Sequence, residues 1–413
     1  MQCKNLIKYL DQYTEKNVLQ FGGHLVDSLS HNVNFAHVVV IPAYKESSNF
    51  VARLLSVPLT VPVLYIIVIN QPDNDFDSSL QTNLSRFIKN SGTSIFKEGD
   101  LDLIVANEHT YFLIVDAFTQ PLPVEQGVGL ARKIGSDYAL FLINENKVLS
   151  DWIHSTDADA HLPNDYFEAT SALSKQKKHN QTVAVSYNFT HVDENIELQQ
   201  ANKLYETALR YYVAGLSYAG SDYDFFTIGS VIAFKAKEYA MVRGFPKRSA
   251  GEDFYLLNKL AKLGKVEFLK DTVVTIEARV SDRVPFGTGP SVANILQLKQ
   301  DNKPYCYYHP QVFDELKNCI SHFAILWESR LYFDDWLSAL SKESRQALQD
   351  IKLASFVDKQ KNNNQIQFNK QLTVWFDAFK TLKFIHSLRE QKYTDIPLQQ
   401  AIETANFTFN EDK

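Results

Sequence analysis

Residues 152–163 read Trp152-Ile153-His154-Ser155-Thr156-Asp157-Ala158-Asp159-Ala160-His161-Leu162-Pro163, an apolar start that runs into two aspartates and is closed by a proline. In an extended segment, residues i and i+2 point to the same side, so Asp157 and Asp159 are expected to converge on one small volume. Two carboxylates that close repel each other unless a cation lies between them. Oxygen ligands without a neighbouring thiolate suit Mg²⁺ or Mn²⁺, and Mg²⁺ commonly binds one or two carboxylates together with substrate phosphates. The stretch therefore predicts a divalent-metal site at the end of a strand, with a plain polar turn as the alternative.

The composition is that of an ordinary folded protein. The 413 residues are 45% hydrophobic and 22% charged, which is typical of a soluble chain with one large domain and an appendage, or with two domains. The formal net charge is −6, so the basic surface that nucleic acids require is not indicated. We expect no nucleic-acid partner.

The chain carries no evident targeting or membrane-spanning segment. Asp11 and Glu15 interrupt the region where a signal peptide needs an apolar core, and the longest apolar runs, such as 61–69, are only as long as a strand. The cysteines are scattered without the spacing of metal ligands, at Cys3, Cys306 and Cys319. These features predict a cytoplasmic protein that contacts a membrane at most peripherally.

Strand patterns alternate with helix patterns between residues 36 and 160. Buried strands are predicted at 37–41 and 63–69, a hairpin over 101–106 and 112–115, and helices near 51–55, 80–88 and 127–141. This alternation indicates an α/β fold with a mainly parallel sheet flanked by helices. Ligands of such sheets bind at the carboxyl ends of the strands. We therefore expect residues 42–44, the loop at Asn70 and the Asp157/Asp159 turn to share one cleft.

The remaining chain continues with strands and then becomes helical. Strands are predicted at 182–187 and 227–234, and helices at 196–212 and from Glu252 onward. Acidic residues such as Glu252 and Asp253 favour a helix N-terminus for electrostatic reasons alone. The segment Arg279–Gly289 mixes arginines with glycines, so it is predicted either to order over a phosphate or to form a surface turn.

Beyond about residue 305, apolar residues recur at helical spacing. The stripes at 312–327 and 372–382 indicate amphipathic helices, which we expect to dock onto the catalytic domain. Basic residues accompany the second stripe at Lys380, Lys383 and Arg389, so contact with a membrane surface is the alternative.

Several segments, in this order, resemble motifs of glycosyltransferase family 2. Pro42-Ala43-Tyr44-Lys45-Glu46 resembles the family's Pro-x-Tyr-Asn-Glu, and Gly127-Val128-Gly129-Leu130-Ala131-Arg132-Lys133-Ile134-Gly135 resembles its Gly-x-x-x-Ala-Arg-Asn-x-Gly. Asp157-Ala158-Asp159 stands where the family has Asp-x-Asp. Gly244-Phe245-Pro246 followed by Gly251-Glu252-Asp253 resembles the acceptor-side Gly-Gly-Phe and Glu-Asp motifs. The resemblance runs over residues 37–265 and does not extend to the helical tail.

The resemblance implies a GT-A fold that uses a UDP- or GDP-linked sugar and Mg²⁺ or Mn²⁺, with a carbohydrate, lipid or small polyol as acceptor. It implies a nucleoside pocket lined by Pro42, Ala43, Tyr44 and Glu46. It places Arg132 near the nucleotide, Asp157 facing the ribose or the metal, and Asp159 on the metal and diphosphate. It assigns the role of general base to Asp253, with Glu252 as the competing candidate.

Two departures from the family pattern leave parts of the donor site open. The family's second strand usually ends in an aspartate that reads the base, whereas this one ends Asn70-Gln71-Pro72-Asp73, so Asn70, Asp73 or Asp75 could take that role. The family's C-terminal histidine ligand is also not evident. Arg279 and Arg283 stand in that region, and Arg283 is the expected phosphate contact.

We read the chain as a metal-dependent glycosyltransferase of the hexosyltransferase type that inverts configuration, with retention as the alternative. Departure of a nucleoside diphosphate needs its charge neutralised by the metal and by cations such as Arg132 or Arg283. The expected organisation is a helical lead-in at 1–35 broken at Gly22-Gly23, a catalytic domain at 36–300, and a helical region at 301–413. The nucleotide-sugar half would span about 36–160 and the acceptor half about 161–300.

Two other functions were weighed. A nucleotidyltransferase would need a glycine-rich signature after the first strand, where Lys45-Glu46-Ser47-Ser48 stands instead. A non-catalytic protein that binds nucleotide sugars or glycans would be expected to have lost one of the two carboxylate sites, and both are present.

Overall fold

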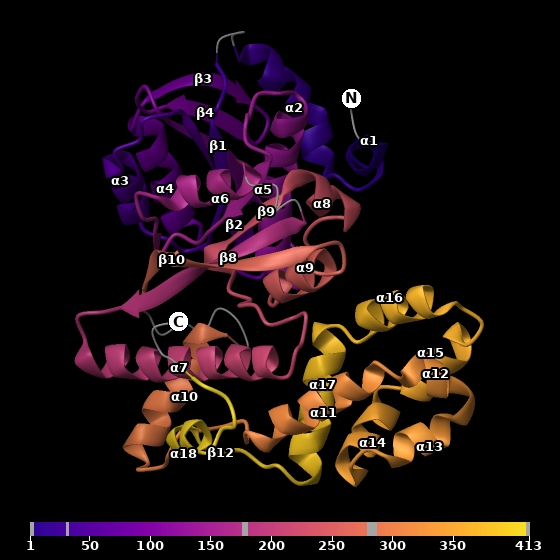
Figure 1. The fold of residues 1–413 in the computed structure, drawn as a ribbon. Helices are drawn as coiled ribbons and strands as arrows, with labels where there is room; N and C mark the ends of the chain where they lie inside the picture. The colour runs from indigo at the N-terminus through magenta and orange to yellow at the C-terminus, as the bar shows by residue number, and fades with distance from the viewer. Residues whose placement is uncertain (1–3, 30–32, 176–180, 279–286, 410–413) are drawn as a thin grey trace. The chain divides into compact units, whose positions relative to one another are not determined.

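A computed structural model describes residues 4–29, 33–175, 181–278 and 287–409 (Figure 1). The described residues up to Val192, together with Thr227–Ala278, form a first compact unit. Asp193–Phe226 and the described residues from 287 onward form a second one. The helices at 196–218 and 288–300 therefore group with the second unit, although the predicted division at residue 300 placed them with the sheet. The functional division itself stays a prediction.

The first unit is built on one mixed sheet in the order β3-β4-β5-β2-β1-β6-β9-β8-β10-β7. Its strands are β1 (His37–Ala43), β2 (Val63–Pro72), β3 (Thr93–Glu98), β4 (Leu101–Val105), β5 (Thr110–Leu122), β6 (Trp152–Ser155), β7 (Ala160–His161), β8 (Thr182–Val192), β9 (Ile232–Lys235) and β10 (Lys265–Glu277). The central strands β5, β2, β1 and β6 are parallel, and β8 is parallel to β10. The predicted hairpin is the antiparallel pair β4–β5, and antiparallel pairs also join β6, β9 and β8. The α/β class with a parallel sheet centre is thus confirmed.

Helices flank both faces of the sheet (Figure 1). They are α3 (Asn49–Ser56), α4 (Ser79–Asn90), α5 (Gly127–Asn144), α6 (Tyr166–Lys175), α8 (Ala236–Met241) and α9 (Glu252–Leu260). Apolar residues of α3 and α4 join one face of β1 and β2 in a common core that includes Val39, Phe50 and Leu84. On the other face α5 approaches closely, since a Cβ added at Gly135 would lie 2.4 Å from Val40 Cγ1. Gly135 therefore sets how near α5 lies to the central strands.

The N-terminal residues form two helices, α1 (Lys4–Gln12) and α2 (Lys16–Ser28), as the lead-in predicts. The predicted break at Gly22-Gly23 is wrong, because α2 continues through both glycines. A Cβ at Gly22 would lie 2.9 Å from Cε1 of Phe141 on α5. The glycine serves a close approach between helices, and burial against Phe141 offsets its weak helix propensity.

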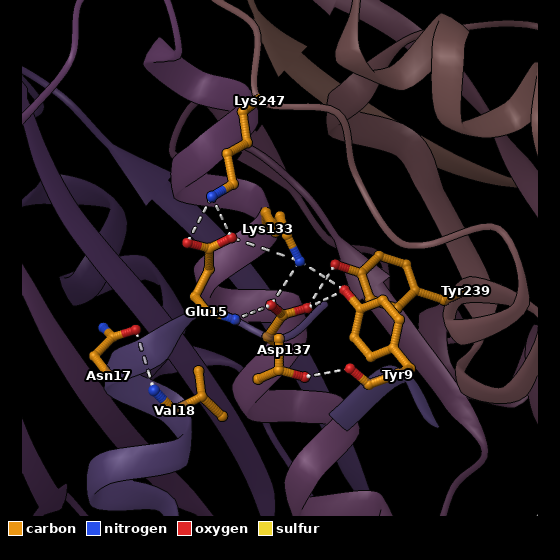
Figure 2. Close-up of polar contacts among 9 residues, drawn as sticks. Tyr9, Glu15, Asn17, Val18, Lys133, Asp137, Tyr239 and Lys247 are labelled. Atoms are coloured by element: carbon orange, nitrogen blue, oxygen red, sulfur yellow. Dashed lines mark hydrogen bonds and ion pairs between the residues drawn. The ribbon is translucent and has the colours of Figure 1, made fainter. Parts of the chain in front are cut away.

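A buried polar cluster joins α1 to α5 (Figure 2). The carboxylate of Asp137 accepts hydrogen bonds from Tyr9 Oη at 2.6 Å, Tyr239 Oη at 3.0 Å and Lys133 Nζ at 2.8 Å. The backbone N–H of Glu15 donates to the same carboxylate at 2.9 Å. Burial raises the pKa of Asp137, and the neighbouring Lys133 opposes that shift. The lead-in is therefore joined to α5 by hydrogen bonds from Tyr9 and from the Glu15 N–H to the buried Lys133–Asp137 ion pair.

The second unit is mainly helical. Its elements are α7 (Ile196–Tyr218), α10 (Thr288–Gln300), α11 (Gln311–Phe323), α12 (Leu326–Ser329), α13 (Phe333–Ser338), α14 (Lys342–Asp350), α15 (Leu353–Gln360), α16 (Gln365–Trp375), α17 (Ala378–Gln391) and α18 (Leu398–Glu403), with a short ribbon of β11 (Cys306–Tyr307) and β12 (Ile396–Pro397). The first apolar stripe is buried within the second unit itself. Its residues Val312, Phe313 and Leu316 lie in a core of this unit that includes Phe384 and Ile385.

The second stripe, predicted as one helix over 372–382, is divided. Helix α16 ends at Trp375, and Asp377 accepts a hydrogen bond from the backbone N–H of Lys380 at 3.2 Å to begin α17. An aspartate N-cap inside an apolar stripe is thus the physical reason for two helices. Among the described residues, no helix has the length and apolar character that crossing a bilayer requires.

Candidate active site

The carboxyl ends of three neighbouring parallel strands meet at one edge of the sheet. Strand β1 lies between β2 and β6, with Ala43 opposite Ile69 and Val40 opposite Ser155. Tyr44 follows β1 and Asp157 lies just after β6, whereas Asn70, predicted to lie in a loop, belongs to β2, which continues to Pro72. The register therefore places these three residues at the same edge of the sheet, and the cleft that they are expected to share stays a prediction.

The turn after β6 carries both aspartates, and their convergence on one volume stays a prediction. Thr156, Ala158 and Ala160 are buried, whereas Asp157 and Asp159 keep partial exposure. The Thr156 hydroxyl donates to the carbonyl oxygen of Ser230 at 2.7 Å. Burial thus alternates along the turn, with both carboxylate-bearing residues at the partly exposed positions.

Arg132 of α5 connects this turn to a second acidic segment. Its Nη2 donates to Asp157 Oδ1 at 2.7 Å, and its Nε donates to Glu252 Oε1 at 2.9 Å. Its Nη1 donates to the Ser155 hydroxyl at 2.9 Å. The guanidinium is 3% exposed, and although burial lowers the pKa of Arg132, the carboxylates of Asp157 and Glu252 outweigh burial and raise it. Arg132 is therefore a permanent buried cation with a carboxylate on each side.

Space for this arginine comes from a glycine in a neighbouring segment. A Cβ at Gly229 would lie 2.5 Å from Arg132 Nη2. The predicted strand at 227–234 is only half right, because Gly229–Val231 forms a 3₁₀ turn and β9 begins at Ile232. The turn brings the Gly229 backbone beside the guanidinium and the Ser230 carbonyl to Thr156.

The start of α5 is held against the loop that precedes α9. The Gly129 N–H donates to the carbonyl oxygen of Arg248 at 2.9 Å, and a Cβ at Gly129 would lie 2.5 Å from the Pro246 carbonyl oxygen. Gly127 has a φ of +35° and faces Ser249 just as closely. The glycines at the start of the family-like segment thus allow the loop before Glu252 to lie directly on the helix that carries Arg132.

Glu252 and Asp253 have different environments although they are adjacent at the start of α9. Gly251 precedes them in the left-handed conformation, with a φ of +70°. Glu252 is 4% exposed and bonded to Arg132, whereas Asp253 is partly exposed and accepts from the Phe254 N–H at 2.7 Å. Burial and the Glu252 carboxylate raise the pKa of Asp253 to about 7, although Arg132 opposes both. A carboxyl that titrates near neutrality suits a general base or acid.

The loop after β1 is bonded to the loop after β2. The Tyr44 hydroxyl donates to Asp75 Oδ2 at 2.7 Å, and Lys45 Nζ lies 3.1 Å from the same oxygen. The Tyr44 hydrogen bond, together with Lys45, lowers the pKa of Asp75. Pro42 and Ala43 are buried, while Tyr44 and Glu46 are partly exposed.

The three candidates for reading the base are placed differently. The Asp75 carboxylate is engaged by Tyr44 and Lys45, and the exposed Asp73 accepts from the Val124 N–H at 3.1 Å. Asn70 is 5% exposed, and within the described residues its Oδ1 has no hydrogen-bond partner. A buried acceptor without a partner is costly, so Asn70 has the strongest physical need for a ligand donor.

The predicted metal and phosphate ligands are only partly described. Arg279 and Arg283 lie outside the described residues. Among the residues that are described, no group of three or more histidine, cysteine, aspartate or glutamate side chains could hold a metal. Asp157 and Asp159 fit a cation that takes one or two carboxylates and completes its shell with diphosphate oxygens and water.

Comparisons with known proteins are sparse. No protein-family model matches the chain, and no curated protein matches it. One similar solved structure is a mannosyltransferase, PcManGT from Pyrobaculum calidifontis, in complex with GDP-Man and Mn²⁺. The two chains are 15% identical, the match covers 94% of this chain and 100% of that one, and the TM-score is 0.38. At that TM-score the likeness carries no argument about the site.

The sequence pattern did not single out Ser155 or Gly229. Ser155 anchors the guanidinium of Arg132 and Gly229 makes room for it. Neither a serine at the end of a strand nor a single glycine indicates, from the sequence, which residue of another element it contacts.

Proposed function

We propose that this protein is a glycosyltransferase that moves a sugar from a nucleoside-diphosphate sugar to an acceptor hydroxyl, with inversion and with Mg²⁺ or Mn²⁺. The observation that carries the proposal is the double ion pair of Arg132, which joins the Asp157 turn to the Glu252-Asp253 helix start. Arg132 thus connects the turn of the predicted metal ligands, Asp157 and Asp159, to the helix start that carries Asp253, whose pKa lies near neutrality. These residues lie at the carboxyl edge of a parallel sheet. The motif resemblance over residues 37–265 supports the same reading.

Each residue has a stated role in this proposal. Asp159 and Asp157 would hold the cation, which when bound supplies charge neutralisation for the departing diphosphate. Arg132 fixes the orientation of the Asp157 carboxylate through its 2.7 Å bond. Asp253 takes the proton of the acceptor hydroxyl, whose oxygen forms a bond to the anomeric carbon of the sugar as the bond to the diphosphate oxygen breaks.

A donor panel with Mn²⁺ tests the function directly. A ligand that binds only the folded state raises stability by about 2.7 kcal/mol at 100 times its Kd, so the true nucleotide sugar should raise the melting temperature measurably. We expect wild-type protein to release a nucleoside diphosphate from that donor, and Asp159→Ala to lose turnover because the main metal ligand is gone. Asp157→Ala should weaken donor binding and, because it takes one of two carboxylates from the buried Arg132, should also lower the free energy of unfolding.

The alternatives give different products. Release of pyrophosphate would indicate a nucleotidyltransferase, and saturable binding without turnover across donors and acceptors would indicate a binding protein. Full activity of Asp159→Ala in excess EDTA would refute metal dependence at this turn.

Asn70 is predicted to contact the base of the donor. Asn70→Ala removes an acceptor whose hydrogen bond is worth about 1 kcal/mol, so the KM for the donor should rise about fivefold while kcat is unchanged. Steady-state kinetics measure this, with the exposed Asp73→Ala as the matched control. A raised KM in Asp73→Ala and an unchanged one in Asn70→Ala would assign the base contact to Asp73 instead.

A further inference from the structure

A charged side chain holds the backbone of the Asp157–Ala160 turn from another element. Arg53, on α3, donates from Nη2 to the carbonyl oxygens of Ala158 at 2.7 Å and of Ala160 at 3.2 Å. Its Nη1 donates to Glu277 Oε1 at 2.7 Å. Neither Arg53 nor Glu277 belongs to the motifs that resemble the family, and neither has a role in the chemistry described above.

Glu277, at the end of β10, completes the arrangement. Its backbone N–H donates to the carbonyl oxygen of Asp159 at 2.9 Å. Its carboxylate also accepts from, or shares a proton with, His161 Nε2 at 2.9 Å. The carbonyls of Ala158, Asp159 and Ala160 are thus bound in succession by groups of α3 and β10. The peptide planes on both sides of Asp159 are fixed by residues far away in the sequence.

The geometry requires an arginine. A guanidinium presents its N–H groups in a rigid planar fork, so one side chain can reach two carbonyls with one nitrogen and a carboxylate with another. A lysine ammonium carries the same charge on a flexible stem and cannot reproduce the fork. Glu277 is exposed, and an exposed ion pair adds little to stability. The arrangement is therefore better suited to fixing the turn than to stabilising the fold.

We propose that Arg53 and Glu277 are positioning residues for the cation site, holding the turn so that Asp157 and Asp159 face the metal together. The inference rests on the proposed function. Arg132 fixes the Asp157 side chain, whereas Arg53 and Glu277 fix the backbone on which both aspartates stand. Looser anchoring of the turn weakens the binding of the cation first, because the two carboxylates must converge to bind it.

The test uses full-length Arg53→Lys and Glu277→Gln, with Arg86→Lys as the matched control. Arg86 is an exposed arginine on α4 whose Nη1 donates to Asn83 Oδ1 at 3.2 Å, so it controls for the loss of a guanidinium at the surface. Binding of Mn²⁺ in the presence of UDP or GDP is measured by the electron paramagnetic resonance of free Mn²⁺. The Mn²⁺ dependence of kcat at saturating donor gives a second, kinetic value.

We expect the Mn²⁺ dissociation constant to rise at least tenfold in Arg53→Lys, in line with the loss of partners that orient metal ligands, and less in Glu277→Gln. Saturating Mn²⁺ should restore most of kcat, and the melting temperature should stay near that of Arg86→Lys. A wild-type protein that binds Mn²⁺ with UDP or GDP, together with an Arg53→Lys variant of equal Mn²⁺ affinity, would overturn the positioning role alone. A wild-type protein that binds no Mn²⁺ with either nucleotide and turns over no donor would overturn the proposed function as well.

Discussion

Asp253→Asn is expected to lower kcat by at least about 10²-fold while leaving donor affinity nearly unchanged, since a positioned base contributes about 10²–10⁴-fold. An acceptor hydroxyl is a poor nucleophile until its proton is removed, and asparagine keeps the shape of the side chain without the basic oxygen. Asp253 combines partial exposure with a pKa raised to about 7 by burial and by Glu252. Single-turnover and steady-state kinetics with the donor identified by the panel measure the effect.

The pH dependence of kcat/KM provides a second test of this prediction. Because the base must be deprotonated, wild-type kcat/KM should fall as the pH drops below about 7, and Asp253→Asn should lack that acidic limb. The folded pKa lies above the ordinary value of 3.8, so between those pH values the folded state binds the proton more tightly than the unfolded state. This group therefore lowers stability as the pH rises through that window. Asp253→Asn should melt higher than wild type above pH 7, with the difference vanishing below about pH 4.

Glu252→Gln is the matched control. It removes the neighbouring charge that raises the pKa of Asp253, so the acidic limb should move to lower pH and kcat should fall less than in Asp253→Asn. Glutamine can still accept from Arg132 through its amide oxygen. An inactive Glu252→Gln variant together with a normally active Asp253→Asn variant would show that Glu252, and not Asp253, is the general base.

Local periodicity was enough to predict the edge of the sheet where the candidate site lies. The β-branched runs of β1 and β2 are buried along almost their whole length, which is what a strand covered on both faces requires. The spacing of Asp157 and Asp159 likewise determines that they share a side of the chain. These inferences need only neighbours in sequence; the burial of β1 and β2 confirms the first, and the second stays a prediction.

Local periodicity does not predict contacts between residues that are far apart in the sequence. Arg132 meets Glu252 across 120 positions, and no pattern within α5 names that partner. The glycines at 22 and 23 were misread for the same reason, since the packing of Gly22 against Phe141 overrides their low helix propensity. The choice among Asn70, Asp73 and Asp75 also depended on tertiary hydrogen bonds, chiefly that from Tyr44 to Asp75.

The other large effect is expected on stability, at the cluster that joins the N-terminal helices to α5 (Figure 2). Asp137→Leu leaves Lys133 Nζ, whose side chain is 6% exposed, without its 2.8 Å carboxylate partner. It also takes the acceptor from the hydroxyls of Tyr9 and Tyr239 and from the Glu15 N–H. Removing one partner of a buried ion pair costs about 3–5 kcal/mol, because the remaining charge stays desolvated.

We therefore expect Asp137→Leu to lower the free energy of unfolding by about 3–5 kcal/mol, measured from denaturant midpoints at constant m-value. The double variant Lys133→Met/Asp137→Leu should recover a large part of that loss, since it removes the buried charge that Asp137→Leu leaves with only the Tyr9 hydroxyl and the more distant Glu15 carboxylate, at 3.7 Å. Asp137→Asn should lie between wild type and Asp137→Leu, because the amide still accepts from a tyrosine hydroxyl but no longer pairs with Lys133. Tyr9→Phe removes the hydrogen bond that Tyr9 donates to Asp137 and the one that it accepts from Lys133 Nζ, and should cost about 2 kcal/mol. A double variant no more stable than Asp137→Leu would show that the loss comes from disrupted packing around α1 and α5, and not from the charge left on Lys133.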